Sequence, residues 1–344
     1  MSDRIDLTGV EHWLLMGGGS LLLAMAALLA ERKVSFVIAA GTRHLAEAMD
    51  DGDSFRSVVE RNGWPYWEVA DIHADTRVAD WISRPTVGLS LGAPWVIRQE
   101  LIERFGRRLF NSHGARLPRD RGAGGFSWRI LRGDRLGYSV LHELTSGVDK
   151  GGVVKLQEYL FPPGCRTPAD YQTYARERDY SMLASLVDDV ETGRSLDVRS
   201  QPEYLSAYWP RLHTQTNGAI DWRWTLADIE RFINAFDRPF AGAFTLMNGE
   251  RRHLRACQTT TDDGAFHPFQ RGLVYRKSEI GLFIAVDGGG LIVSEVLDSQ
   301  GKNVTPSVRL GDRFHTPENL LAEALCFRAQ FTATGLQGVG LVLK

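Results

Sequence analysis

Short apolar runs that end near glycine alternate with helical stretches at the start of the chain, and this alternation limits the folds open to it. Residues 12–16 are mostly apolar and run into three glycines at 17–19, after which Ser20 opens an apolar helical stretch. Further apolar runs cover residues 34–40 and 86–91. Buried strands separated by helices are typical of a parallel sheet with crossover helices. The first part of the chain is therefore predicted to form an α/β sheet of this kind.

The three glycines also invite comparison with a dinucleotide-binding turn. That fingerprint requires Gly or Ala where this chain has Leu22. It also requires an acidic residue at the end of the second strand, where the sequence reads Ala-Ala-Gly-Thr. The glycines therefore favour a tight strand-to-helix turn over NAD binding.

The pattern changes along the second half of the chain. Residues 167–193 are helical in pattern, and residues 196–216 are polar and irregular, as expected of a linker between domains. Short β-rich runs separated by Gly, Asn and Asp then predict a small antiparallel barrel or sheet. The pattern of residues 317–331 predicts a last helix. We expect an α/β catalytic domain over residues 1–205 and a smaller, β-rich, OB-like domain over residues 206–344.

Charge, cysteine content and hydropathy exclude several classes of protein. Forty basic and 42 acidic side chains give a net charge of −2 without a long basic run, so the footprint of a nucleic-acid binder is missing. The three cysteines form no CxxC pattern and no metal-ligand spacing, which indicates a reducing compartment and no bound metal. The apolar run at 21–30 is too short to cross a membrane, and Asp3 and Asp6 do not suit a signal peptide. A cytoplasmic protein without a membrane partner is expected.

Three side chains between residues 111 and 149 supply the groups that the attack of an amine on a carbonyl carbon requires. His113 would serve as general base, because a histidine with an ordinary pKa of about 6.5 works near neutral pH. Asn111 would donate a hydrogen bond to the developing oxyanion, a contact worth about 3 kcal/mol of barrier. Asp149 would orient His113 and stabilise its protonated form. Asn111 and His113 are two apart on an extended segment and can face one side, whereas Asp149 must be brought to them by the fold.

These residues belong to a longer ordered pattern that resembles the folate-dependent formyltransferase family. The pattern consists of Asn111-x-His113, Leu117-Pro118-x-x-Arg121-Gly122, Trp128, His142 and Asp149-x-Gly151-x-Val153. The family includes methionyl-tRNA formyltransferase, glycinamide ribonucleotide transformylase and the sugar N-formyltransferases. Two departures stand out. Residues 115–116 are Ala-Arg where the family usually has Ser-Leu, and residues 150–152 are Lys-Gly-Gly where it often has Thr-Gly-Asp. The first could alter loop packing and the second the loop beside the folate, but neither removes a catalytic side chain.

The resemblance implies a Rossmann-like catalytic domain that uses N10-formyltetrahydrofolate and releases tetrahydrofolate. It places Asn111, His113 and Asp149 at the catalytic positions, with Asp149 also relaying a proton. The implied folate pocket lies between a strand end and a loop, and its residues are Leu91, Gly92, Ala93, Leu144, Gly147 and Val148. His142 is expected to order the site more than to take part directly, and Trp128 to pack a helix.

The amine acceptor is less defined by the sequence. The stretches 208–211, 220–222 and 238–244 resemble the junction between the family's two domains, and 311–314 fits a closing strand, but the tRNA and sugar branches share these features. Arg121, Tyr208 and Arg211 are candidates to bind a diphosphate and a base, although Arg121 could instead hold its loop and Tyr208 could pack at the junction. Residues 43–70 carry a cluster of acidic side chains that is unfavourable for RNA.

We therefore expect a sugar N-formyltransferase that acts on a nucleotide-linked amino sugar. By resemblance, its product would serve the biosynthesis of bacterial surface polysaccharide. Three alternatives stay open: a methionyl-tRNA formyltransferase, a module that binds or hydrolyses formyltetrahydrofolate, and a tailoring domain for a carrier-bound or hydroxamate amine. The expected partner is a small molecule and not a nucleic acid, and a homodimer is expected only by analogy with sugar-modifying relatives.

Overall fold

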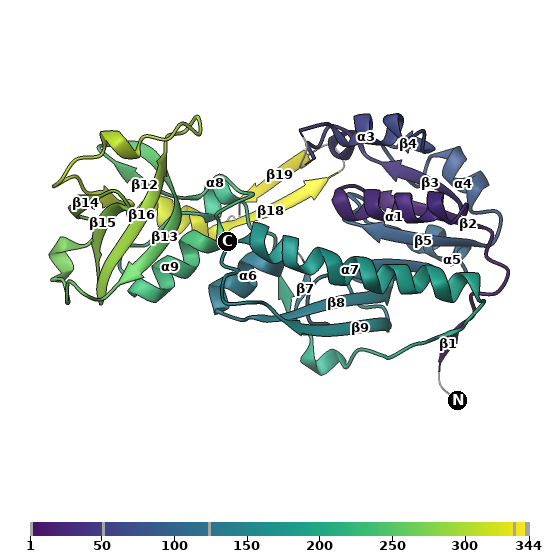
Figure 1. Cartoon of the computed structure of the whole chain (residues 1–344). Coiled ribbons are helices and arrows are strands. Elements are labelled where there is room, and N and C mark those ends of the chain that lie inside the picture. The colour runs from purple at the N-terminus through teal and green to yellow at the C-terminus, as the bar shows by residue number, and fades with distance from the viewer. Residues whose placement is uncertain (1–2, 50–51, 123–124, 333–334, 341–344) are drawn as a thin grey trace.

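The structure is a computed structural model that describes residues 3–49, 52–122, 125–332 and 335–340 (Figure 1). A seven-stranded sheet is followed by a six-stranded antiparallel sheet and a two-stranded hairpin at the C-terminal end. No helix among these residues is long and apolar enough to cross a membrane. The predicted fold class, an α/β part followed by a β-rich part, is confirmed.

The first sheet has the strand order β4-β3-β2-β5-β6-β8-β9. Its strands are β2 (His12–Gly17), β3 (Ser35–Ala40), β4 (Tyr66–Glu68), β5 (Thr86–Leu91), β6 (Leu109–His113), β8 (Leu136–Glu143) and β9 (Val153–Leu160). The first five are parallel, but β8 and β9 are antiparallel to their neighbours, so the sheet is mixed and not wholly parallel. The link between β8 and β9 is too short for the crossover of a dozen or more residues that parallel strands need.

Helices cover both faces of this sheet. Leu15 belongs to a core shared with α1 (Ser20–Glu31) and α7 (Pro168–Glu191), whereas Leu14 belongs to a core on the opposite face. The opposite core includes residues of α4 (Thr76–Trp81) and α5 (Gln99–Arg104). Strands buried on both faces are apolar throughout, which is why their runs are visible in the sequence. The remaining helices of this part are α2 (Thr42–Leu45), α3 (Phe55–Arg61) and α6 (Gly125–Arg132).

The predicted helix over 167–193 is α7, and its start is fixed by its own sequence. Thr167 caps the helix by accepting a hydrogen bond from the Asp170 amide, and the Asp170 side chain bonds back to the Thr167 amide. Pro168 follows in the first turn, where its missing N–H costs nothing. This capping box sets where α7 begins and therefore how its later turns lie along β8 and β9 (Figure 1).

The second sheet has the strand order β14-β15-β16-β13-β12-β17. Its strands are β12 (Ala243–Met247), β13 (Glu250–Thr260), β14 (Val274–Ser278), β15 (Gly281–Val286), β16 (Gly289–Leu297) and β17 (Phe314–His315), with the short turns η2 (Pro268–Gln270) and η3 (Thr305–Ser307) between them. A bridge joins Leu273, just before β14, to Arg313, just before β17. Because β14 and β17 are the two edge strands, the sheet curls into a half-barrel. Helix α9 (Leu226–Ala235) packs on β13, β12 and β16.

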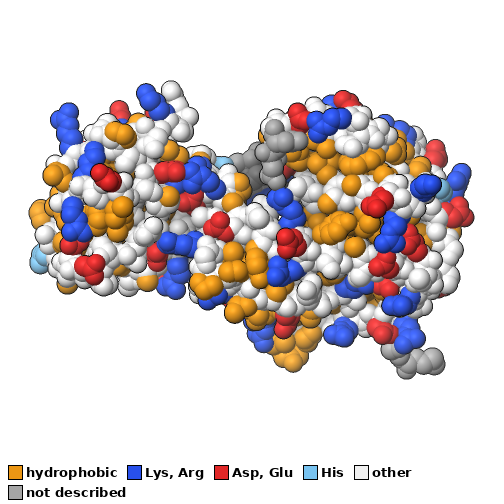
Figure 2. Space-filling view, in the orientation of Figure 1, with side chains coloured by type: hydrophobic (Ala, Val, Ile, Leu, Met, Phe, Trp, Pro, Cys, Tyr) orange, Lys and Arg blue, Asp and Glu red, His pale blue; other side chains and the backbone are white. Residues whose placement is uncertain are grey.

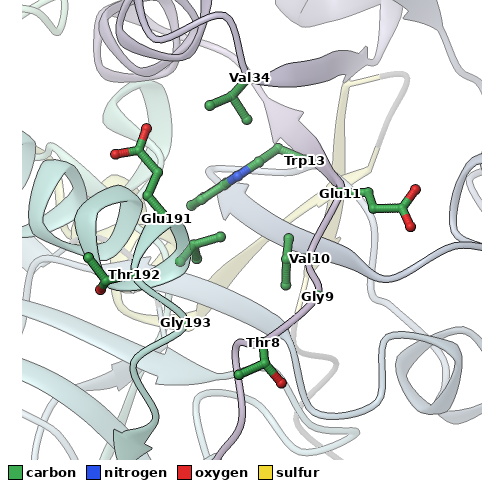
Figure 3. A pocket seen from close by; sticks show the side chains of 10 residues that line it. Thr8, Gly9, Val10, Glu11, Trp13, Val34, Glu191, Thr192 and Gly193 are labelled. Carbon is green, nitrogen blue, oxygen red and sulfur yellow. The ribbon is translucent and has the colours of Figure 1, made fainter.

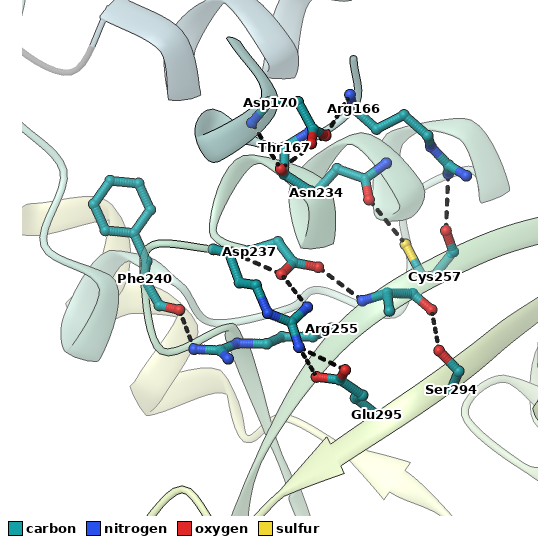
Figure 4. A network of polar contacts seen from close by, with 12 residues as sticks. Arg166, Thr167, Asp170, Asn234, Asp237, Phe240, Arg255, Cys257, Ser294 and Glu295 are labelled. Atoms are coloured by element: carbon teal, nitrogen blue, oxygen red, sulfur yellow. Dashed lines mark hydrogen bonds and ion pairs between the residues drawn. The ribbon is translucent and has the colours of Figure 1, made fainter. Parts of the chain in front are cut away.

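A polar network ties α7 and α9 to the second sheet (Figure 4). Asp237 is fully buried and accepts a hydrogen bond of 2.7 Å from the Ala256 amide. Arg166, just before α7, donates to the Cys257 carbonyl at 2.8 Å and pairs with Glu230 of α9. Because buried polar groups are stable only when bonded, these contacts fix the helix positions relative to β13.

The linker between the two sheets consists of short elements. They are β10 (Leu196–Asp197), η1 (Glu203–Leu205), β11 (Tyr208–Trp209) and α8 (Thr214–Asn217). Strand β10 pairs with β1 (Arg4–Ile5), which comes before the first sheet in the chain. Strand β11 pairs in parallel with β7 (Arg121–Gly122) of the first part. The predicted boundary between residues 205 and 206 stays a prediction, and it falls just before this pairing.

The predicted last helix is shorter than expected. Helix α10 spans Glu318–Cys326, and the chain then turns directly into β18 (Phe327–Thr332), which pairs with β19 (Gly335–Gly340). The prediction of helix as far as residue 331 was therefore wrong. The segment FRAQFT alternates apolar and polar residues with the period of a strand, and this signal was available in the sequence. Figure 1 shows β18 and β19 reaching from the second sheet toward the first.

Candidate active site

The predicted catalytic residues lie near the carboxyl end of strand β6 in the first sheet. Asn111 and His113 are on β6 at its carboxyl end, and Asn111 lies directly opposite His142 of β8. Asp149 follows in the loop that leads from β8 to β9. Because β8 runs antiparallel to β6 and this loop turns back over the strand ends, the fold brings Asp149 to the two histidines. Functional groups gather at the carboxyl ends of the strands in open α/β sheets.

His142 is buried, with 2% of its surface exposed, and both of its ring nitrogens have partners. Its Nδ1 lies 2.7 Å from the Glu143 carbonyl oxygen, so Nδ1 carries a hydrogen and donates it. Its Nε2 lies 3.2 Å from Asn111 Nδ2 and 3.5 Å from an Asp149 oxygen. With the hydrogen on Nδ1, Nε2 accepts from Asn111 Nδ2, so His142 positions Asn111 and lies beside the Asp149 carboxylate.

The ring of His113 is held in one orientation. Its Nε2 lies 3.0 Å from the Asp120 carbonyl oxygen, which can only accept, so Nε2 carries the hydrogen in the neutral ring. Nδ1 is then the nitrogen with a free lone pair. It lies 3.9 Å from Asp149 Oδ2, beyond hydrogen-bond distance but close enough to form an ion pair when Nδ1 is protonated. The arrangement suits a base that takes up a proton at Nδ1.

Asp149 has an unusual backbone conformation, with φ of 49°. Aspartate tolerates this left-handed region better than most residues. Its Oδ2 accepts a hydrogen bond of 2.9 Å from the Gly122 amide, and its carbonyl accepts one of 2.8 Å from Gln201. Burial raises the pKa of Asp149, but His142, His113 and the Gly122 amide outweigh it and lower that pKa to about 2. The carboxylate is therefore ionised at neutral pH.

Gly122 belongs to the predicted family motif, but no role of its own was predicted from the sequence. Its φ is 99°, and a Cβ at this position would lie 2.4 Å from the Trp209 carbonyl oxygen and 2.8 Å from the Tyr208 ring. Only glycine therefore allows β7 and β11 to approach while the Gly122 amide points at Asp149. The glycine positions the carboxylate.

A cleft of about 760 Å³ opens beside Asn111, His142 and Asp149. Five of the six residues predicted for the folate pocket line it: Gly92, Ala93, Leu144, Gly147 and Val148. The sixth, Leu91, lines the neighbouring cavity instead. Trp95 and Ile97 add apolar surface that the sequence did not single out. The mixture of apolar side chains and loop backbone suits a flat heteroaromatic ring with polar edges.

A second cavity of about 430 Å³ lies against His113 and was not predicted. Its walls include the first turn of α1, Phe126 of α6, and Gln172, Arg176 and Asp179 of α7. Arg211 lines both this cavity and the cleft. Burial raises the pKa of Asp179 to about 6 against a hydrogen bond from Ser139. His113 thus lines the second cavity, whereas Asn111 and Asp149 line the cleft.

Arg43 adds a second cation to the cleft. Its guanidinium donates at 3.1 Å to Nε2 of the buried His44. Burial, together with the charges of Arg43 and Arg211, lowers the pKa of His44 to about 4, so His44 is neutral and can accept this bond. Burial raises the pKa of Glu47 and the charge of Arg43 opposes that rise, so one carboxylate lies within reach of this charge. Arg43 and Arg211 together place two cations on this wall of the cleft.

The other two predicted acceptor residues lie differently. Tyr208 lines the cleft and is half-exposed. Arg121 is buried and lines neither hollow; its guanidinium bonds Gln201, Glu203 and Ser206. The geometry thus favours the interpretation that Arg121 holds the linker, and gives no support to a contact with an anionic ligand. Trp128 packs in α6 as expected and donates to the Pro210 carbonyl at 2.7 Å.

A further hollow of about 380 Å³ lies at the opposite end of the strands (Figure 3). Val10 and Trp13 line it at the amino end of β2, and Glu191 and Thr192 line it at the end of α7. Its two carboxylates, Glu11 and Glu191, come with no histidine or cysteine in the lining. Within the described ranges, no group of His, Cys, Asp and Glu is arranged to hold a metal ion.

Comparison with known proteins identifies similar sequences. Residues 213–310 match the family model of the formyl transferase C-terminal domain. The methionyl-tRNA formyltransferase of Akkermansia muciniphila is 28% identical over 204 residues, which are 58% of this chain and 63% of that protein. The chain thus spans less than two thirds of the length of this relative.

Comparison with solved structures identifies the same fold. An N-formyltransferase from Helicobacter canadensis, solved with folinic acid and dTDP-3-aminofucose, superposes with a TM-score of 0.62 at 14% identity, over 83% of this chain and 99% of that one. HypX from Aquifex aeolicus, solved with tetrahydrofolic acid, gives 0.59 at 16% identity, over 85% of this chain and 45% of that one. The predicted resemblance to the folate-dependent formyltransferases is confirmed.

Proposed function

We propose that this chain, which has the formyltransferase fold and a formyl transferase C-terminal domain, transfers a formyl group from N10-formyltetrahydrofolate to an amine. The observation that carries the proposal is the arrangement of Asn111, His113 and Asp149 at the junction of two hollows. One hollow can hold the formyl donor and the other the acceptor, with the base between them.

The cleft of about 760 Å³ fits the donor. Trp95, Ile97 and Leu144 offer apolar surface to a pterin ring, and the backbone of residues 144–149 offers hydrogen bonds to its polar edge. The solved structures with folinic acid and with tetrahydrofolic acid are of similar folds. When bound, the donor supplies an electrophilic formyl carbon and a leaving nitrogen, N10.

His113 takes the proton of the attacking amine at Nδ1, because Nε2 is committed to the Asp120 carbonyl. The imidazolium that results is stabilised by Asp149, whose Oδ2 lies 3.9 Å from Nδ1. Asp149 does not need to move, since the Gly122 amide already holds its Oδ2 at 2.9 Å. The proton can then be returned to the leaving nitrogen, so that the formyl group and the proton exchange places.

Asn111 stabilises the negative charge that develops on the formyl oxygen. An amide N–H is an uncharged donor that needs no reorganisation during the reaction. His142 fixes the Asn111 amide by its contact at 3.2 Å, and its own ring is fixed by the Glu143 carbonyl. His142 is thus a positioning residue in this mechanism.

The acceptor that we propose is a nucleotide-linked amino sugar. The second cavity combines Arg176 and Arg211 with the first turn of α1, and a helix N-terminus next to two arginines favours a phosphate group. Arg43 extends this positive wall into the cleft. The similar N-formyltransferase from Helicobacter canadensis was solved with a dTDP-linked amino sugar.

A second candidate is methionyl-tRNA, because methionyl-tRNA formyltransferases are similar to this chain in sequence. Figure 2 shows positive and negative side chains mixed over the face in view, and no broad positive area there for an RNA backbone. The net charge of −2 also favours the small acceptor.

The test is a parallel incubation with N10-formyltetrahydrofolate, followed by mass spectrometry of the acceptor. One set of tubes holds dTDP- and UDP-linked amino sugars, and another holds methionyl-tRNA. A formyl mass gain on a sugar nucleotide supports the proposal, and a gain on the tRNA alone replaces the acceptor. Release of formate at the same rate with and without every acceptor would make the protein a hydrolase. If the donor is not consumed in any tube, the proposal of formyl transfer is wrong.

A further inference from the structure

The chain continues beyond the matched formyl transferase C-terminal domain, which ends at residue 310. We name α10 and β18, residues 318–332, the C-terminal arm. Its helix is fixed to the second part of the protein, because Leu321 packs with Ala219 and Phe244. The Asn217 side chain donates to the Ala324 carbonyl at 2.7 Å and to the Phe327 carbonyl at 3.1 Å. The arm thus leaves the second part at a fixed point and in a fixed direction.

The strand of the arm contributes one side chain to the cleft. Ala329 is 8% exposed and lines the cleft together with Asn111, His142 and Asp149. The neighbouring Arg328 places its guanidinium 5.6 Å from the centre of the Tyr208 ring, within the range of a cation–π contact. Successive residues of a strand face opposite ways, so Ala329 can face the cleft while Arg328 holds Tyr208.

The position of the arm depends on its contacts with the second part of the protein and with Tyr208. Among the described strands, β18 pairs with β19 and with no strand of the two large sheets. A two-stranded hairpin alone is marginally stable in water, so its position must come from packing. The helix of the arm packs against α8, and Ala329 of its strand lies at the cleft. A segment anchored in this way forms part of the wall of the cleft.

We infer that the C-terminal arm is a wall of the donor cleft, with Ala329 as a specificity-determining residue and Arg328 as its latch on Tyr208. The inference rests on the proposed function for the identity of the donor. Ala329 is small, so it leaves space in the cleft that a larger side chain would fill. As a wall of the cleft that Asn111 and Asp149 also line, the arm limits the access of water to the formyl donor and favours transfer to the amine over hydrolysis to formate.

The experiment uses the full chain and folinic acid, a stable formylated folate, as the probe. Calorimetry gives its Kd for wild type and for the graded series Ala329→Val, Ala329→Leu and Ala329→Phe. We expect the Kd to rise with side-chain size, by about tenfold or more for phenylalanine. The matched control is Ala322→Phe, the same change on the exposed side of α10, which should leave the Kd within about twofold of wild type.

The latch is tested by the rate of folinic acid dissociation, followed by tryptophan fluorescence, since Trp95 lines the cleft. Arg328→Ala should speed dissociation about threefold, and Arg328→Lys should restore most of the wild-type rate. Combining Arg328→Ala with Tyr208→Leu should add nothing to Tyr208→Leu alone, because both remove the same contact. Arg309→Ala is the control, as an exposed arginine away from the arm.

The outcomes separate this inference from the proposed function. Wild type that fails to bind folinic acid would contradict the proposed function. Wild type that binds, with a Kd unchanged across the whole Ala329 series, would overturn the arm as a wall. A change of oligomeric state in Arg328→Ala, seen by light scattering with unchanged dissociation, would make the arm a contact between copies instead. Thermal melts identify any variant that fails to fold. If the larger substitutions do not fold, the Kd of the smaller Ala329→Val variant tests whether the arm is a wall of the cleft.

Discussion

At the scale of single residues, His113 has the geometry that most directly predicts a loss of activity. Its Nε2 is held by the Asp120 carbonyl, so Nδ1 is the nitrogen that we propose as the base. His113→Ala should lower kcat by about 10²- to 10⁴-fold and leave the Kd of folinic acid within about twofold. Steady-state kinetics and calorimetry measure the two quantities. The exposed His315 offers a control, His315→Ala. Near-normal turnover in the His113 variant would refute its role as base.

Asp149 acts on the same ring through its charge. Its pKa is lowered to about 2, so it is ionised throughout the range in which the enzyme would work. The pH profile of kcat/KM should therefore show no acid limb from this carboxylate. Asp149→Asn keeps the acceptor for the Gly122 amide but removes the charge, and kcat should fall by about a hundredfold. A variant that loses folate binding but keeps its kcat would show instead that Asp149 serves binding.

The raised pKa of Asp179 predicts that the free energy of unfolding depends on pH. Its folded pKa is raised to about 6 by burial, above the ordinary value of 3.8. The native state therefore holds its proton more tightly than the unfolded state, and the stability gained below pH 3.8 is lost as the pH rises through about 6. Asp179→Asn should raise the free energy of unfolding at pH 7 by up to about 3 kcal/mol and change it little near pH 4. Urea unfolding at both values checks this, and a variant that destabilises at pH 7 would contradict it.

At the scale of elements, the pairing of β7 with β11 depends on Gly122. Its φ of 99° and the short approach of the Trp209 carbonyl leave no room for a Cβ. Gly122→Ala should lower stability by about 1–3 kcal/mol and also reduce kcat, because the amide that holds Asp149 moves. The control is Gly164→Ala, where a Cβ would meet nothing within 4 Å. Equal effects of the two substitutions would show that β7 can adjust.

Much of the fold could be predicted from the sequence, because buried parallel strands are apolar on both faces. The predicted runs 12–16, 34–40 and 86–91 fall on β2, β3 and β5. The antiparallel directions of β8 and β9 could not be predicted, since a local apolar pattern does not distinguish a parallel strand from an antiparallel one. The strand of the C-terminal arm was missed because a helical pattern was extended past residue 326, although the residues after it alternate with a period of two.

The candidate site could be predicted only in part. Asn111, His113 and Asp149 carry a pattern, but the second cavity is made of side chains without one. Gln172, Arg176 and Asp179 lie four and then three residues apart, so they share one face of α7. A polar stripe of this kind is common on exposed helices, and only the packing of α7 against the sheet reveals that this one lines a cavity beside His113.

At the scale of the whole molecule, the two sheets are not independent units. The core of the second sheet includes Ile130, Phe161 and Tyr171, which belong to α6, to the chain after β9, and to α7. Phe161 is fully buried and stacks on Tyr171 with ring centres 3.9 Å apart. Because one core serves both parts, loosening it should loosen both.

We therefore expect a single cooperative unfolding transition for the full chain, with folinic acid shifting all of it upward. Phe161→Ala should destabilise the protein by about 3–5 kcal/mol while keeping one transition. Calorimetry measures the transition, and hydrogen exchange at β2 and at β13 reports the two sheets separately. The exposed Phe269 gives a matched control, Phe269→Ala.

Two separate transitions, with Phe161→Ala lowering only the one reported by β13, would mean that the sheets fold independently. The site would then be stabilised by the first part alone, and the donor should shift only the transition reported by β2.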